Sequence, residues 1–309
     1  MKKKYRLITR SDMDGLVCAV LLKHIDIIDD IKFVHPKDMQ DGIIEVTPND
    51  ITTNLPYNKN AYLVFDHHES EASRHDKSDN YIMVSDAPSA ARVVYDYYVK
   101  QGFSFPDEWE DMMIAVDKAD AAQFEINDVL NPKGWEFLSF LMDSRTGLGR
   151  FRDFRISNYN LMMNLIDYCK DHTIEEIMEL PDVVERSELY KKYKDDFLNQ
   201  LKKCSKVYDN LVVLDLTKEE IIYPGNRFMI YALYPQCNIS IHKILGFKGQ
   251  NIVYAVGKSI FNRTSNTDIG QLMLEYGGGG HNAAGTCQIA HEDADRVLEE
   301  LIKKINQDG

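Results

Sequence analysis

Short aliphatic runs alternate with a helical segment near the N-terminus, and this alternation limits the possible folds more than any other feature of the chain. Residues 5–9, 31–34 and 61–65 are predicted strands, and residues 16–28 are a predicted helix. Strands that alternate with helices form a mostly parallel sheet with crossover helices. Ligands bind to such a sheet beyond the carboxyl ends of its strands. The residues that follow those ends are therefore the first candidates for a functional site.

A second α/β pattern begins near residue 211, after a long charged segment. This segment, residues 183–208, is predicted to be one helix because apolar residues recur every four positions from Leu189 to Leu201. A rod of this kind suits a connector between domains. We therefore predict an α/β protein of two domains. Residues 1–205 form a mostly parallel, doubly wound sheet and the connector helix, and residues 206–309 form a smaller α/β domain.

The charge and cysteine content narrow the class of protein. The chain has 309 residues, 49 acidic and 36 basic, with a formal net charge of −13. This charge argues against a protein that clamps long duplex nucleic acid, because most of its surface repels a polyanion. The five cysteines are scattered and never spaced Cys-x-x-Cys, as is typical of a reducing compartment. The sequence has no run long enough for a signal peptide or membrane span, so we expect a cytoplasmic protein that acts away from membranes.

Acidic and histidine side chains directly follow two of the predicted strands. Asp12 and Asp14 follow the first strand, and Asp66-His67-His68 follows the strand at 61–65. Residues two apart in an extended chain point to the same side, so Asp12 and Asp14 can face one ion or a pair of ions. Carboxylate with imidazole suits Mn, Fe, Co or Zn better than Ca. Two such ions about 3.5–4 Å apart can activate a water molecule and stabilise the leaving oxygen of a phosphoryl ester.

Further aspartates are candidate ligands for the same site. Asp50 precedes the strand at 61–65 and is a candidate to bridge two ions, and Asp117 and Asp120 follow an apolar helix. A single aspartate in such a position is more often a helix cap. For the set as a whole the metal interpretation is favoured, because two acid-bearing turns follow strand ends.

Three motifs, in this order along the chain, resemble those of the DHH phosphoesterase family. They are Asp12-Met-Asp14-Gly15, Asp66-His67-His68 and the run Gly277-Gly-Gly-Gly-His281-Asn-Ala-Ala-Gly285. The last resembles the DHH-associated C-terminal domain. The family includes RecJ-type exonucleases, phosphodiesterases of nanoRNA and dinucleotides, and exopolyphosphatase-like proteins. The resemblance implies a manganese centre, with two Mn²⁺ ions and with Mg²⁺ or Co²⁺ as substitutes.

The resemblance also implies a role for each matching residue in the metal centre. Asp120 is preferred to Asp117 as a ligand because Phe124 follows it by four residues. The implied metal ligands are Asp12, Asp14, Asp50, His67 and Asp120. The implied catalytic residues are the ligand His67 itself, Asp66, which would orient it, and His68, which would lie beside the substrate phosphate.

One position departs from the family pattern. Relatives carry a histidine four or two residues before the first aspartate, where this chain has Ile8 and Arg10. Neither side chain is an ordinary metal ligand, so one ion would have a ligand fewer.

Glycines and arginines supply candidate contacts to an anionic substrate. Glycine backbone N–H groups can approach a phosphate closely, and a planar guanidinium suits bidentate phosphate contact. An arginine-rich segment at 143–155 and a second-domain arginine fit this role. The arginine-rich segment supplies the candidates Arg145 and Arg150, unless it is a solvated loop whose arginines pair with local aspartates. The resemblance implies Arg263, Gly278, Gly279, Gly280 and His281 as further substrate-binding residues.

The sequence thus predicts a metal-dependent phosphoesterase that cleaves short oligonucleotides or dinucleotides through a water activated by two ions. Two alternatives stay open: an exopolyphosphatase that releases orthophosphate from polyphosphate, and a nucleotide-binding protein with a weakened metal site. The Gly-rich edge of the second domain would also allow a homodimer.

Overall fold

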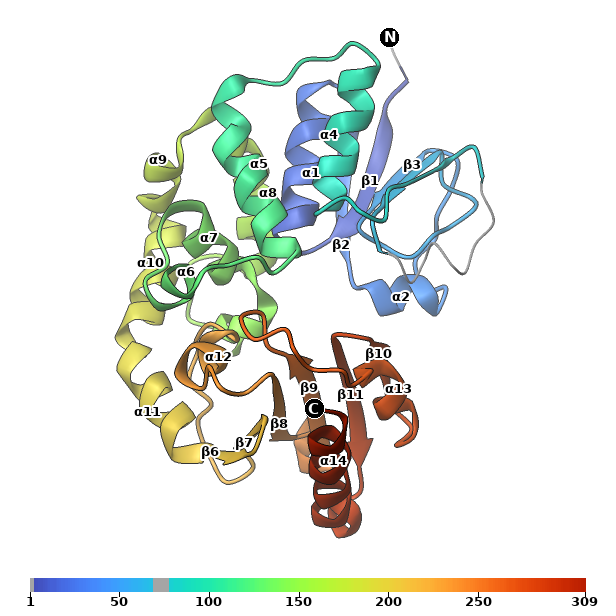
Figure 1. The fold of residues 1–309 in the computed structure, drawn as a ribbon. Coiled ribbons are helices and arrows are strands. Elements are labelled where there is room, and N and C mark those ends of the chain that lie inside the picture. Colours follow the sequence, from blue (N-terminus) through green and yellow to red (C-terminus); the bar gives the residue numbers. More distant parts are fainter. Residues whose placement is uncertain (1–2, 69–77) are drawn as a thin grey trace. The chain divides into compact units, whose positions relative to one another are not determined.

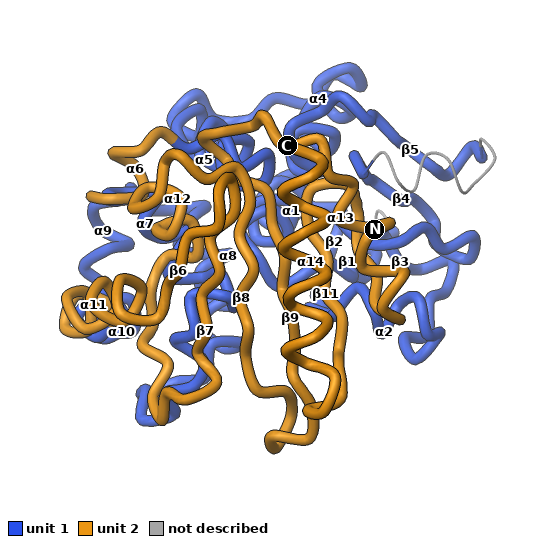
Figure 2. The backbone as a smooth tube through the Cα atoms, turned by 60° about the horizontal axis from the view of Figure 1, so that its bottom comes forward, with its two compact units in different colours: residues 1–124, 132–189 blue, residues 125–131, 190–309 orange. Residues whose placement is uncertain are grey.

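The computed structural model describes residues 3–68 and 78–309, and the chain divides into two compact units (Figures 1 and 2). Unit 1 contains residues 1–124 and 132–189, and unit 2 contains residues 125–131 and 190–309. The predicted mixed α/β fold with two domains is confirmed. The division after residue 189 lies earlier in the chain than the predicted boundary at 205.

Unit 1 is built on a sheet of five parallel strands in the order β2-β1-β3-β4-β5. The strands are β1 (Tyr5–Arg10), β2 (Ile28–Val34), β3 (Asp50–Thr53), β4 (Leu63–Asp66) and β5 (Tyr81–Met83). The chain starts at β1, adds β2 on one side and then returns to add β3 on the other. The strand order therefore reverses between β1 and β3, and a crevice at the carboxyl ends of such a pair is where open α/β sheets bind ligands.

Helix α1 lies at the centre of unit 1. It follows β1 directly, and α4, α5 and α8 contact it. Every residue from Met13 to Leu22 is buried, as expected of a helix that is apolar on all sides. The helices of unit 1 are α1 (Met13–His24), α2 (Pro36–Gln40), α4 (Ala90–Lys100), α5 (Glu110–Asp120), α7 (Gly134–Met142), α8 (Asn158–Asp171), α9 (Ile174–Met178) and the greater part of α10 (Pro181–Lys192).

Unit 2 contains a mixed sheet of six strands in the order β10-β11-β9-β8-β7-β6. Its strands are β6 (Ser205–Tyr208), β7 (Leu211–Asp215), β8 (Ile239–Leu245), β9 (Ile252–Lys258), β10 (Gly279–His281) and β11 (Ala284–Ile289). Its helices are α6 (Ile126–Leu130), α11 (Lys194–Cys204), α12 (Met229–Leu233), α13 (Ile269–Leu274) and α14 (Ala294–Asp308). The apolar stripe of α14, with Val297 and Leu301, packs in one core with Ile239 and Ile241 of β8.

The single helix predicted over 183–208 is wrong in detail. Helix α10 ends at Lys192, α11 runs from Lys194 to Cys204, and the last four residues form β6. Strand β6 pairs antiparallel with β7 through a turn at Asp209 and Asn210, where Asp209 has a φ of 52°. A left-handed residue in a two-residue turn is the signature of a β-hairpin, and aspartate and asparagine tolerate it. This turn signal overrides the helical periodicity of the preceding residues.

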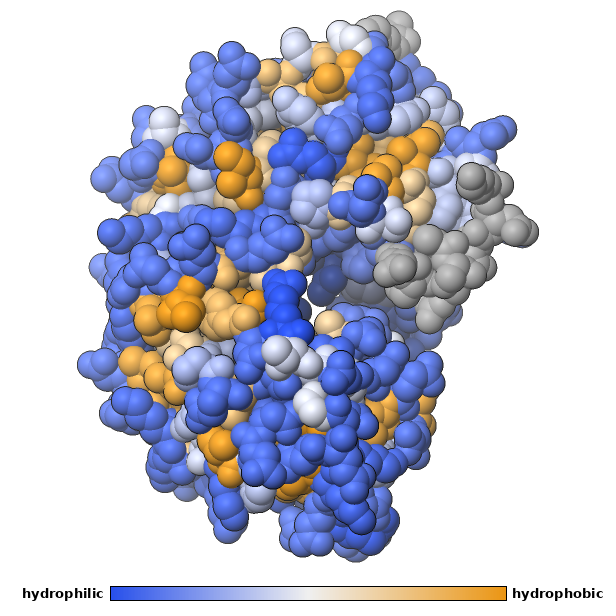
Figure 3. Space-filling view, in the orientation of Figure 1, coloured by the Kyte–Doolittle hydropathy of each residue, from blue (hydrophilic) through white to orange (hydrophobic). Residues whose placement is uncertain are grey.

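The surface is mostly hydrophilic on the face shown in Figure 3, where the hydrophobic side chains form several separate small groups. Among residues 3–68 and 78–309, no helix is both long enough and apolar enough to cross a lipid bilayer.

Candidate functional site

The turn from β1 into α1 positions the first two acidic residues. Asp12 is the N-cap of α1, and its Oδ1 accepts a hydrogen bond of 3.0 Å from the backbone N–H of Gly15. A Cβ atom at Gly15 would lie 1.9 Å from the carbonyl oxygen of Arg10. Only glycine therefore allows α1 to begin this close to the end of β1. The helix then carries Asp14 in its first turn.

Asp14 is a buried carboxylate held by the start of another helix. Its oxygens accept backbone hydrogen bonds of 3.0 Å from Ala90 and 2.7 Å from Ala91, at the N-terminus of α4. Burial, with the nearby charge of Asp120, raises the pKa of Asp14 to about 8. A carboxylate that is costly to ionise in the isolated fold is well placed to be neutralised by a cation.

His67 and Asp120 complete a group of potential metal ligands with Asp14. Nε2 of His67 lies 2.8 Å from Oδ2 of Asp120, and Nδ1 donates a 3.1 Å hydrogen bond to the Ala87 carbonyl. Burial opposes protonation of His67, but the hydrogen bond and charge of Asp120 outweigh it and raise its pKa to about 9. The carbonyl of Ala87 fixes the proton on Nδ1, which leaves Nε2 to bind a cation.

One atom from each of these three residues lies within 4.8 Å of the others. Among the described residues, this is the only place where three or more His, Cys, Asp or Glu side chains come close enough to hold one metal ion. Two carboxylates with one imidazole suit Mn²⁺, Fe²⁺, Co²⁺ or Zn²⁺. The site therefore fits a divalent cation on Asp14, His67 and Asp120.

Comparison with known proteins identifies the family. No protein-family model and no curated protein matches the chain. Among solved structures, the chain is similar to PggH, a pGpG-specific phosphodiesterase from Vibrio cholerae, with 64% sequence identity and a TM-score of 0.88. The match covers 99% of this chain and 100% of that one. The chain belongs to the DHH phosphoesterase family.

More distant structures share the fold. RecJ from Thermus thermophilus, solved in complex with Mn²⁺, is 12% identical with a TM-score of 0.57, over 99% of this chain and 52% of that one. CDC45 from Entamoeba histolytica is 11% identical with a TM-score of 0.50, over 99% and 96%. At these identities the likeness concerns the fold alone.

The DHH motif itself is arranged differently from the sequence-based expectation. Asp66 is fully buried and lies 2.7 Å from Nδ1 of His68, so its side chain pairs with the second histidine. It contacts His67 only through the backbone N–H, at 2.9 Å. The expectation that Asp66 orients the His67 ring is therefore wrong, because the Ala87 carbonyl takes that place.

Asp50, expected to bridge two ions, is not part of this group. It is the first residue of β3 and therefore lies at the opposite end of the sheet from Asp12, which follows β1. Its oxygens accept hydrogen bonds of 2.7 and 3.0 Å from Arg6 and of 2.6 Å from the backbone N–H of Thr47. Burial opposes ionisation, but these contacts together lower its pKa. Asp50 is a structural ion-pair partner of Arg6.

A different residue of the same segment reaches the site. Asn54 follows the last residue of β3, is buried, and donates a 3.2 Å hydrogen bond from its amide to Oδ1 of Asp12. Its φ of 54° turns the chain sharply after the strand. Sequence reasoning missed it because β3 was not predicted. The sequence feature that could have revealed it is an asparagine at the end of a short β-branched run, Ile51-Thr-Thr-Asn54.

The structure separates Asp120 from its competitor Asp117. Asp117 accepts hydrogen bonds from Ser89 at 2.7 Å and from Nε of Arg92 at 2.9 Å. It therefore lies outside the group formed by Asp120, His67 and Asp14.

The expected substrate-binding residues lie in both units. In unit 1, Arg145 follows helix α7 and pairs with Asp143 at 2.7 Å, and Arg150 covers Gly147. In unit 2, the side chain of Arg263 is exposed and its Nε donates to the Ile260 carbonyl at 3.0 Å. How these residues contact a substrate stays a prediction.

The Gly-rich run forms a hairpin rather than an open loop. Gly279 and His281 of β10 pair with Thr286 and Ala284 of β11. A Cβ atom at Gly278 would lie 2.1 Å from the carbonyl oxygen of Thr286, and one at Gly280 would lie 2.3 Å from that of Ala284. Close approach of the two strands thus accounts for these two glycines, whereas Gly279 faces open space.

The contrast between Asp50 and the metal group gives a testable prediction. Asp50→Asn is expected to lower the free energy of unfolding by about 2 kcal/mol, because the charged partner of Arg6 is lost. The affinity for Mn²⁺ should not change, since Asp50 lies at the other end of the sheet. Urea unfolding and calorimetric titration with Mn²⁺ measure the two effects. A large loss of Mn²⁺ affinity would show that Asp50 acts on the metal group after all.

Proposed function

We propose that this DHH phosphoesterase hydrolyses the phosphodiester bond of short linear dinucleotides, with pGpG as its substrate and Mn²⁺ as its metal. The observation that carries the proposal is the group Asp14, His67 and Asp120, in a chain 64% identical over 99% of its length to a pGpG-specific phosphodiesterase. The group supplies the metal ligands, and the relative supplies the substrate class.

The three residues that would hold the cation are themselves positioned by other parts of unit 1. Asp14 is fixed by the N-terminus of α4, and His67 by the Ala87 carbonyl. A divalent cation bound there supplies Lewis-acid stabilisation of phosphoryl oxygens and a water of lowered pKa. The mixture of imidazole and carboxylate favours Mn²⁺, with Mg²⁺ or Co²⁺ as substitutes.

His68 is proposed to act on the substrate phosphate. The hydrogen bond that Nδ1 of His68 donates to Asp66 raises the pKa of His68, whose side chain is 41% exposed. An imidazolium beside the site can donate a hydrogen bond to a phosphate oxygen and a proton to the leaving oxygen of the ribose. Asp66, buried and hydrogen bonded to the backbone of both histidines, keeps the ring of His68 in position.

The choice of a short substrate rests on charge. With a net charge of −13, the chain favours a small anion held by a few arginines over a long duplex. Arg145, Arg150, Arg263 and the hairpin residues Gly278, Gly279, Gly280 and His281 are the proposed substrate contacts. A cytoplasmic location is proposed because all five cysteines are free thiols, as is typical of a reducing compartment. A homodimer stays a proposal.

The proposal is tested by product analysis on the metal-free protein with and without added Mn²⁺. The substrates are pGpG, a second 5′-phosphorylated dinucleotide (pApA) and polyphosphate, and Asp120→Asn is the inactive control. We expect Mn²⁺-dependent release of GMP from pGpG that is lost in Asp120→Asn. Orthophosphate from polyphosphate alone would indicate an exopolyphosphatase. Binding of pGpG without any product would indicate a nucleotide-binding protein, and either result would overturn the proposal.

A further inference from the structure

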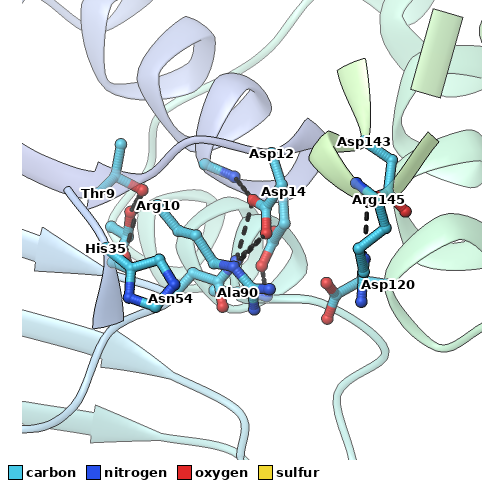
Figure 4. Close-up of polar contacts among 12 residues, drawn as sticks. Thr9, Arg10, Asp12, Asp14, His35, Asn54, Ala90, Asp120, Asp143 and Arg145 are labelled. Atoms are coloured by element: carbon cyan, nitrogen blue, oxygen red, sulfur yellow. Dashed lines mark hydrogen bonds and ion pairs between the residues drawn. The ribbon is translucent and has the colours of Figure 1, made fainter. Parts of the chain in front are cut away.

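The carboxylate of Asp12 is occupied by donors from the protein itself. Its Oδ1 accepts from the N–H of Gly15 at 3.0 Å and from the amide of Asn54 at 3.2 Å. Its Oδ2 lies 2.9 Å from Nε of Arg10 (Figure 4). Asp12 is also absent from the group formed by Asp14, His67 and Asp120. It therefore acts as the partner of a guanidinium.

Arg10 brings a fixed positive charge to the acidic group. It is the last residue of β1, and its side chain turns back to Asp12 beside the metal ligands (Figure 4). The guanidinium is thus a positive charge held against Asp12 by direct contact.

The three aspartates at this end of the sheet, one of which lies outside the metal group, balance in charge with one divalent cation and Arg10. Asp12, Asp14 and Asp120 carry three negative charges when ionised. One divalent cation and the Arg10 guanidinium neutralise them, whereas two divalent cations beside Arg10 would leave two positive charges in excess. Repulsion between Arg10 and a second cation at Asp12 would be strong in a partly buried site.

The end of β3 adds no charge to this balance. β1 is followed by Asp12, and β4 ends at Asp66 and is followed by His67, but between them β3 is followed by the neutral Asn54. The amide of Asn54 donates to Asp12 and so occupies one of its lone pairs. This strand end therefore offers no anionic ligand for a position between two ions: it supplies a neutral amide, whose nitrogen donates to Asp12 and whose buried Oδ1 has no hydrogen-bond partner among the described residues.

We infer that the site holds one divalent cation, on Asp14, His67 and Asp120, and that the guanidinium of Arg10 takes the place beside Asp12 that a second cation would need. This inference rests on the proposed function and replaces the expectation of two ions. The side chain of Arg10 is 34% exposed, so its edge is accessible to a phosphate oxygen. A planar guanidinium there binds phosphate in the way that a second cation would.

The number of bound ions tests the inference without reference to activity. Metal-free protein is dialysed against increasing Mn²⁺, bound metal is counted by mass spectrometry, and electron paramagnetic resonance separates isolated from coupled Mn²⁺. Wild type, Arg10→Lys and Asp12→Asn are expected to bind about one ion per chain, without a coupled signal. Arg10→Lys keeps a positive charge beside Asp12, and Asp12→Asn removes no ligand of the single cation. Arg10→Met should approach two ions at saturation, because Asp12 loses its fixed counter-charge.

Arg6→Met is the matched control. Arg6 lies on the same strand and also pairs with an aspartate, Asp50, at the other end of the sheet. It should keep the wild-type stoichiometry.

Two coupled ions in the wild type would overturn the inference and leave the proposed function intact. An Arg10→Met variant that binds the same number of ions as Arg6→Met would do the same. Asp12→Asn keeps the test decisive if Arg10→Met does not fold, because loss of an ion in Asp12→Asn would identify Asp12 as a ligand. A wild-type chain that binds no Mn²⁺ would contradict the proposed function itself.

Discussion

Asp14→Asn is expected to lower kcat for pGpG hydrolysis about a thousandfold, because the cation that it helps to hold contributes several kcal/mol to the transition state. Asparagine has the size of aspartate but lacks its charge, and only one of its two polar atoms can accept the N–H groups of Ala90 and Ala91. The variant should therefore lose the metal, and it should keep the fold because its size is unchanged and one of the two hydrogen bonds remains.

The free energy of unfolding of the metal-free Asp14→Asn variant should not fall, in contrast to its kcat. In the metal-free wild type, burial and Asp120 raise the pKa of Asp14 to about 8. Its pKa in the unfolded chain is about 3.9, so the folded state binds a proton between these values and stability falls as pH rises from about 4 to about 8. Asparagine does not ionise, so Asp14→Asn lacks this fall in stability with rising pH. At pH values near 8, the metal-free variant should be no less stable than the wild type.

Thermal unfolding with and without Mn²⁺, alongside steady-state kinetics, measures both effects. Mn²⁺ should raise the Tm of the wild type by mass action and leave that of Asp14→Asn unchanged. Asp50→Asn is the control, since it removes a buried aspartate from the same unit but should keep the Mn²⁺-induced shift. An Asp14→Asn variant that retains more than about a tenth of wild-type kcat would contradict the assignment of Asp14 as a ligand.

The difference between Asp14 and Asp50 shows which parts of the site are readable from sequence. Asp14 lies in a local motif in which the capping residue, the glycine and the apolar helix follow one another, so its position is set by neighbours in the chain. Asp50 and Asn54 are placed by β3, which has only four residues. Which end of such a strand meets the site depends on its pairing with β1, and that pairing is non-local.

The roles inside Asp66-His67-His68 were likewise not readable from the motif. Both histidines lie next to Asp66 in sequence; the ring of His68 pairs with Asp66 itself, whereas the partners of the His67 ring lie far along the chain. Ala87 accepts from His67, and Asp120 comes from α5. The two-domain α/β fold was predictable because strand and helix periodicities recur along the chain. The helix predicted over 183–208 failed where a two-residue turn, Asp209 and Asn210, set the pairing instead.

Arg186→Met is expected to lower the free energy of unfolding by about 3 kcal/mol, the cost of removing one partner from a buried charged network. Arg186 is 1% exposed and donates to the Ile156 carbonyl at 2.7 Å and to Oδ1 of Asn158 at 2.9 Å. It also donates to Oε1 of Glu185 at 2.9 Å, and its guanidinium lies 4.1 Å from the ring centroid of Phe154. Methionine fills much of the volume but removes the donors to the Ile156 carbonyl and the Asn158 amide oxygen, while Glu185 keeps the backbone N–H of Arg155.

Urea unfolding of Arg186→Met measures this loss, with Arg92→Met as the control. Arg92 pairs with Asp117 and its side chain is 27% exposed, so its replacement should cost about 1 kcal/mol. Equal losses in the two variants would show that the Arg186 network adds nothing beyond a surface ion pair.

Because Arg186 anchors Phe154, Ile156 and Asn158, it fixes the end of the segment that carries Arg145 and Arg150. A folded Arg186→Met protein should therefore show a KM for pGpG that rises more than kcat falls, since the proposed phosphate contacts loosen while the metal ligands stay in place.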